Sequence, residues 1–125
     1  MSNIFRTAAA TILALHGLIH LIGPSVYLKL TELDEFAYKT TLLGGRWDLG
    51  ERGIQAFGVL WVFPAIGFLA AAAGLLLGYD WWGWVLATTT VFSLVLTALD
   101  YRVAFAGIVV NVVILLTLLI RTGNA

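Results

Sequence analysis

The chain has 125 residues, of which 61% are hydrophobic and only 11% are charged, and its formal net charge is zero. Soluble domains carry about a quarter charged residues, so this composition argues against a soluble globule and predicts a multi-pass protein of the cell membrane. No basic cluster points to a nucleic-acid partner, and the lack of cysteine excludes disulfides, thiolate catalysis and cysteine-ligated metal centres.

Four apolar segments are long enough to cross a bilayer, which takes about 20 helical residues. They cover about residues 7–28, 53–77, 82–99 and 103–120. In lipid every backbone amide and carbonyl must be satisfied within its own segment, and no barrel-like alternation is present. We therefore predict a single all-α membrane domain over residues 1–125, built as a bundle of four transmembrane helices.

The first span carries two histidines in the stretch LHGLIHLIGP, which no charged residue interrupts. His16 and His20 are four residues apart, so they share one face of a helix. Pro24 in the same span and Pro64 in the second span lack the amide that a helix needs. Each proline predicts a bend about one turn earlier in its helix.

The connection between the first and second spans is the one that has room to fold. Thr31-Glu32-Leu33-Asp34 has the form of a capping box, apolar residues follow at helical spacing, and Gly44-Gly45 supplies a stop. We therefore predict a short amphipathic helix at the membrane interface, at about residues 32–43.

The other connections, at residues 78–81 and 100–102, are very short, so the second, third and fourth spans are predicted to be antiparallel neighbours. The long loop and the turn at residues 100–102 share one side of the membrane. Most of the cations are on this side, at Lys29, Lys39, Arg46, Arg52 and Arg102. The positive-inside rule then predicts that the long loop is cytoplasmic and that both termini are outside.

Polar side chains within the spans gather in the half of the bundle next to the long loop. At 1.5 Å per residue, His20 and His16 lie about 12 and 18 Å from that side. Polar groups in a span face the bundle interior or a wet cavity, so we predict a crevice open to the loop side. The predicted ligand-binding residues are His16, His20, Arg52, Gln55, Thr97, Asp100 and Asn111.

The two histidines have several interpretations. They can be structural, with neutral imidazoles bonded across helices to groups such as Asn111. They can also handle protons or orient a ligand. A metal site would need a third ligand from Glu51 or Asp100. Bis-histidine haem would need a homodimer, because two histidines on one helix face cannot bind opposite sides of one haem. The sequence therefore requires no cofactor.

A row of small residues on the second span, Ala70, Gly74 and Gly78, favours close helix packing. The same row is a candidate surface for a homo-oligomer. The other predicted partners are the lipid bilayer and an apolar small molecule or lipid.

Four stretches carry a resemblance that covers almost the whole chain: LHGLIHLIGP, ERGIQAFGVLWVFPAIGFLAAA, the WW pair and LDYRVAFAGIVVNVVILL. The chain resembles a group of uncharacterised small bacterial four-span proteins, and it is similar in size and layout to DoxX-like membrane proteins. The resemblance implies a four-helix fold and no established activity. Its recurrent positions would match His16, Gly17, His20, Gly23, Arg52, Gly58, Trp61, Gly107 and Asn111.

Two functional hypotheses follow. In the first, the protein binds or passes an apolar or amphipathic ligand through the polar crevice. In the second, it is an accessory or structural membrane subunit in which the same polar groups hold the helices together. An enzyme remains a third hypothesis, for which the sequence offers no nucleophile–base arrangement.

Overall fold

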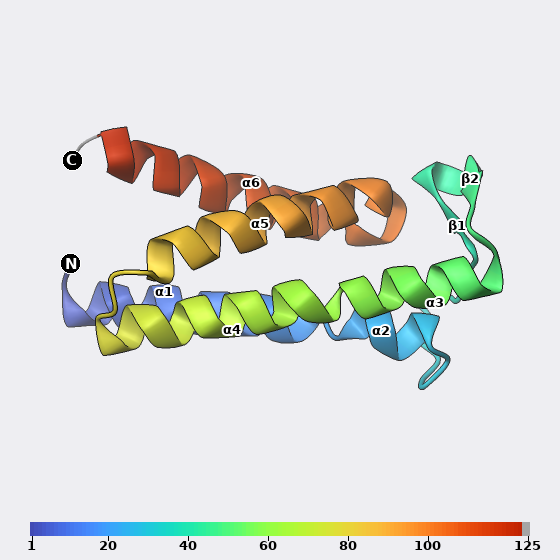
Figure 1. Ribbon diagram of the computed structural model, residues 1–125, viewed down its shortest axis with the longest axis horizontal. Helices are drawn as coiled ribbons and strands as arrows, with labels where there is room; N and C mark the ends of the chain where they lie inside the picture. Colours follow the sequence, from blue (N-terminus) through green and yellow to red (C-terminus); the bar gives the residue numbers. More distant parts are fainter. Residues whose placement is uncertain (124–125) are drawn as a thin grey trace.

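The computed structural model describes residues 1–123 as four long helices that run side by side. The first span consists of α1 (Asn3–Ile19) and α2 (Ile22–Tyr27), the second of α3 (Gly50–Leu60) and α4 (Val62–Leu77), the third of α5 (Trp82–Leu99) and the fourth of α6 (Tyr101–Gly123). All four are long and apolar enough to cross a membrane. The predicted all-α bundle is confirmed, and α1 begins at the same end of the molecule at which α6 ends (Figure 1).

Both spans that contain a proline are interrupted about one turn before it. The amide of His20 donates to the Gly17 carbonyl at 3.1 Å, three residues back instead of four, and the helix resumes at Ile22. The amide of Trp61 likewise donates to the Gly58 carbonyl at 3.2 Å. These tightened turns are where Pro24 and Pro64 were predicted to disturb their helices.

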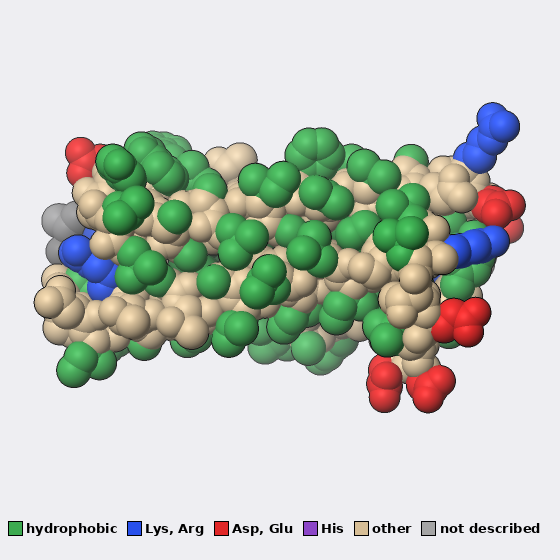
Figure 2. Space-filling view, turned by 90° about the horizontal axis from the view of Figure 1, so that it is seen from below, with side chains coloured by type: hydrophobic (Ala, Val, Ile, Leu, Met, Phe, Trp, Pro, Cys, Tyr) green, Lys and Arg blue, Asp and Glu red, His purple; other side chains and the backbone are tan. Residues whose placement is uncertain are grey.

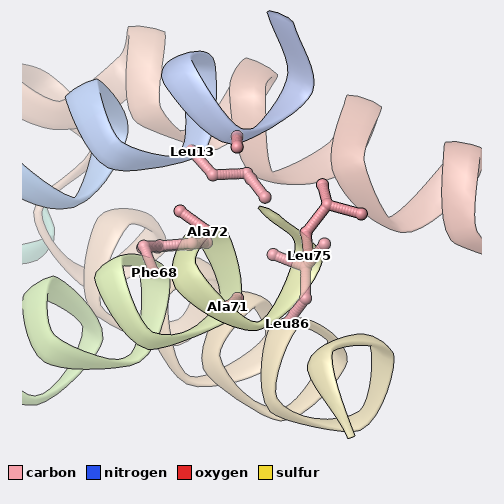
Figure 3. Packing of buried hydrophobic residues seen from close by; sticks show 7 residues of the cluster. Leu13, Phe68, Ala71, Ala72, Leu75 and Leu86 are labelled. Carbon is pink, nitrogen blue, oxygen red and sulfur yellow. The ribbon is translucent and has the colours of Figure 1, made fainter. Parts of the chain in front are cut away.

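The helices pack in the order α1, α4, α5, α6, and α2 packs on α3. Two apolar clusters form the core. The cluster near the termini joins α1, α4 and α5 and consists of Ala10, Leu13, Phe68, Ala71, Ala72, Leu75 and Leu86 (Figure 3). The cluster near the long loop consists of Val26, Tyr27, Leu42, Ile54, Phe57, Trp61 and Leu96.

The outer surface of the bundle is apolar. Hydrophobic side chains cover the body of the molecule in Figure 2, and charged side chains are seen at its two ends. Phe63, Ile66 and Phe105 are each at least 60% exposed. A surface of this size and composition suits hydrocarbon as its solvent.

The predicted interfacial helix at residues 32–43 is wrong. The chain instead makes a turn closed by a Leu33–Phe36 bridge and then a hairpin of β1 (Thr41–Leu42) and β2 (Trp47–Asp48), joined by the 3₁₀ turn η1 (Leu43–Gly45). Leu42 is 1% exposed in the loop-side cluster, and Lys39 reaches Asp100 at the end of α5. These contacts override a capping signal that is worth only about 1 kcal/mol.

The small-residue row of α4 is used inside the chain. A Cβ on Gly74 would lie 2.8 Å from the Trp81 ring, so this glycine gives space to the start of the third span. Gly78 ends α4 with a left-handed φ of 76°, which favours glycine. The row therefore does not present a continuous open helix face, and the homo-oligomer stays a prediction.

Candidate functional site

The two histidines of α1 belong to a closed ring of buried hydrogen bonds that joins α1, α5 and α6. Nε2 of His16 is 3.0 Å from Oδ1 of Asn111, and Nδ2 of Asn111 is 2.9 Å from Oγ of Ser93. The same Oγ is 2.5 Å from Nε2 of His20, whose Nδ1 is 2.7 Å from the carbonyl oxygen of His16. None of the four residues is more than 6% exposed.

The ring has one consistent set of donors when both imidazoles are neutral. A carbonyl oxygen only accepts, so Nδ1 of His20 carries its proton and donates to His16 O. Nε2 of His20 is then an acceptor, and the Ser93 hydroxyl donates to it. The Ser93 oxygen accepts from the Asn111 amide nitrogen, which leaves the Asn111 oxygen to accept from Nε2 of His16.

Reversing the direction of the ring would require a charged His20. If Ser93 donated to Asn111, Nε2 of His20 would have to donate to Ser93 while Nδ1 still donates to the carbonyl. No ion pair within residues 1–123 involves either histidine. A charge at the centre of a span costs about 2.5–3.5 kcal/mol for Arg, Lys or Asp, so the neutral ring is favoured.

One lone pair of the ring remains unused. His16 is protonated on Nε2, so its Nδ1 is an acceptor, and no hydrogen bond within residues 1–123 reaches it. Across the same residues, the side-chain atoms that are buried without a partner are Arg6 Nε and Trp61 Nε1. Nδ1 of His16 is not one of them, so it keeps accessible surface.

A cavity of about 200 Å³ lies beside the ring, between the first span and α6. His16, His20 and Thr97 are the polar residues of its lining, and Phe36 of the long loop also belongs to the lining. The remaining lining residues are apolar or glycine: Ile19, Ile22, Gly23, Trp61, Val103, Ala104, Ala106, Gly107 and Val110. No charged side chain among residues 1–123 lines it.

The cavity borders the lipid-facing surface. Ile19 and Ile22 are 59% and 36% exposed, and Ala106 on the opposite wall is also exposed. A molecule dissolved in the bilayer can therefore approach between α1 and α6. The crevice was predicted to open to the loop side, whereas this cavity borders the lipid-facing surface and has Phe36 of the long loop in its wall.

Aromatic rings fix the orientation of both imidazoles. Phe68, which is fully buried, lies 4.6 Å from the His16 ring and 5.2 Å from the His20 ring between centroids. Trp61 lies 5.3 Å from His20. Side chains held in this way are preorganised, because few rotamers are open to them.

Of the predicted site residues, His16, His20, Thr97 and Asn111 are brought together. Thr97 Oγ1 donates to the Ser93 carbonyl at 2.9 Å and lies 3.4 Å from Asn111 Nδ2. Gln55 is half-buried and Arg52 is exposed on α3, and neither lines the cavity. Ser93 bonds to both His20 and Asn111, but it was not among the predicted site residues.

Asp100 is buried in a separate cluster closer to the loop. Its carboxylate accepts from the Tyr27 hydroxyl and from Lys39 Nζ, the latter at 2.6 Å. Lys39 Nζ also donates to the Tyr27 oxygen at 2.7 Å. We call Tyr27, Lys39 and Asp100 the loop latch, because they tie the long loop to the first and third spans.

Few side chains are placed to bind a metal ion or haem. Within residues 1–123 no three His, Asp or Glu side chains are grouped to hold a metal ion. Both nitrogens of His20 are engaged in the ring, so His16 Nδ1 is the imidazole nitrogen left to bind anything else. Haem shared between two copies of the chain stays an untested alternative.

Comparisons with protein-family models, curated proteins and solved structures find no match for this chain, so its resemblance to small four-span proteins stays a prediction.

Proposed function

We propose that this protein binds, or passes across the membrane, an uncharged apolar or amphipathic molecule that enters the cavity between α1 and α6 from the bilayer. The observation that carries this proposal is the cavity itself. It combines apolar walls with a small polar surface from His16, His20 and Thr97, which is the usual make-up of a ligand pocket.

The size of the cavity limits what part of a ligand it holds. Pockets for whole drug-sized molecules span about 300–1,000 Å³, and this cavity measures about 200 Å³. Its border with the lipid-facing surface allows the rest of a longer molecule to stay in the acyl chains. The proposed ligand is therefore an elongated molecule that places one end next to His16.

The second candidate is an accessory or structural membrane subunit. The closed hydrogen-bond ring favours it, because the ring attaches α6 to α1 and α5 and Asn111 is the buried residue of α6. In this case the ring would be interhelical glue and the cavity would be a packing defect filled by lipid.

Native mass spectrometry of the protein released from detergent micelles separates the two candidates. We expect 1-dodecanol to bind the wild type with a ratio of one per chain. Val110→Phe, which fills the cavity wall on α6, should lose this binding. The matched control Val109→Phe changes a neighbour that is 48% exposed and outside the cavity lining, and it should bind as the wild type does.

Binding that survives Val110→Phe as well as Val109→Phe would place the alcohol on the outer surface. The ligand-binding proposal would then fall, and the structural subunit would be the better account.

A further inference from the structure

We propose that the ligand is hydrogen-bonded through a donor of its own, an O–H group, to Nδ1 of His16. This inference rests on the proposed function and names the chemical class of the ligand: a neutral, membrane-soluble alcohol or phenol. A ketone, ether or ester without such a donor is excluded from this role.

The first step is the direction of the hydrogen-bond ring. The His16 carbonyl fixes the proton on Nδ1 of His20, and this choice propagates through Ser93 and Asn111 to Nε2 of His16. The ring is closed and each of its donors has an acceptor, so it does not need a ligand to be stable. The group of the ring that remains free to bind a ligand is the lone pair on His16 Nδ1.

The second step is the set of groups available in the cavity. Thr97 already donates its hydroxyl proton to the Ser93 carbonyl. Both His20 nitrogens have partners in the ring. The Trp61 indole N–H has no partner within residues 1–123, but its nitrogen is covered by protein atoms and offers no accessible donor. The accessible polar group is therefore an acceptor, and a ligand that matches it must donate.

The third step is charge. No charged side chain among residues 1–123 lines the cavity, and its border faces lipid. An ammonium group would donate well but would enter an apolar cavity without a counter-ion, which is costly. A neutral hydroxyl satisfies His16 Nδ1 without that cost.

The test uses native mass spectrometry of the intact protein to compare the affinities of two probes that share a dodecyl chain. 1-Dodecanol donates and accepts, whereas dodecyl methyl ether only accepts. A net hydrogen bond is worth about 0.5–1.5 kcal/mol, so the wild type should bind the alcohol about two- to twelvefold more tightly than the ether.

A matched pair of variants assigns the preference to His16. His16→Phe removes the acceptor, whereas Val109→Phe changes an exposed residue of α6 that belongs to neither the ring nor the cavity lining. We expect the alcohol-to-ether ratio to fall to about one in His16→Phe. In Val109→Phe the ratio should stay near the wild-type value.

The outcomes distinguish this inference from the proposed function. Equal binding of both probes by the wild type overturns the donor requirement while the cavity remains a binding site. A preference that persists in His16→Phe overturns the assignment to His16. If neither probe binds above the level of Val110→Phe, the proposed function and this inference fail together. The wild-type comparison decides the inference even if a variant does not fold.

Discussion

The chemistry of the site follows from the position of His20 at the end of α1. Its amide donates to Gly17, three residues back, and its imidazole donates to the carbonyl of His16, four residues back. The side chain thus takes the place that the amide would hold in a continuous helix. An interruption of the backbone thereby fixes which nitrogen of His20 is protonated, and with it the donor order of the ring.

Glycines at helix contacts place the aromatic rings that support the histidines. A Cβ on Gly23 would lie 2.8 Å from the Trp61 ring, so the first and second spans approach closely only because this position has no side chain. Trp61 in turn packs against His20 and is 5% exposed.

We predict that Gly23→Ala destabilises the protein by about 1–3 kcal/mol, because the added methyl group forces the Trp61 ring or the helix to move. The measurement is reversible unfolding in mixed micelles. Gly83→Ala is the control, since a Cβ there meets no atom within 4 Å. It should be neutral or stabilising by about 0.5–1 kcal/mol, and a similar loss in both variants would refute the packing argument.

Among the elements, the long loop has a structural role that its sequence pattern concealed. Residues 28–49 are held against the bundle by the loop latch, in which Asp100 has 1% of its side chain exposed and Lys39 has 28%. Lys39 also lies 5.1 Å from the centre of the Tyr27 ring. Phe36 of the same loop lines the cavity, and its ring centroid lies 5.4 Å from that of Tyr27 in the latch.

We predict that Lys39→Met loosens the whole loop, because Asp100 then keeps a buried charge with the Tyr27 hydroxyl as its partner. The readout is hydrogen–deuterium exchange of residues 28–49, which should be faster by tenfold or more, corresponding to about 1.4 kcal/mol.

Lys29→Met is the matched control for this prediction. Lys29 pairs with Glu51 at 3.0 Å, but both side chains are more than half exposed, so this pair adds little stability. Exchange should stay close to that of the wild type. If both variants accelerate exchange equally, the latch has no special role.

At the scale of the whole molecule, the fold places the long loop at one end of the bundle and the two ends of the described chain at the other (Figure 1). The chain has no cysteine, so single cysteines can report its topology without a background. We predict that a membrane-impermeant maleimide labels Ser2→Cys and Thr122→Cys in intact cells, and labels Glu35→Cys only after permeabilisation. Labelling of Glu35→Cys in intact cells would reverse the orientation, and labelling of all three would contradict four spans.

The four spans could be predicted because apolar length is a local property of the sequence. The hairpin could not, since burial of Leu42 and pairing of Lys39 with Asp100 depend on segments far apart in the chain. The same holds for Tyr27, which is fully buried and bonds to Asp100.

The candidate site was predictable in part. A histidine or an asparagine stands out in an apolar span, so His16, His20 and Asn111 could be found. Residue counting also gave their depth, but it did not give the rotation of one helix against another. Arg52 was therefore grouped with the histidines although its side chain is exposed on α3.

Nitrogen-15 NMR of histidine-labelled protein in nanodiscs at neutral pH tests the central claim most directly, because protonated and unprotonated imidazole nitrogens have well-separated signals. The closed ring predicts two neutral histidines of opposite tautomer, with the proton of His20 on Nδ1 and that of His16 on Nε2. A proton on Nδ1 of His16, or a doubly protonated ring at either position, would contradict the donor order and remove the acceptor on which the proposed ligand recognition depends.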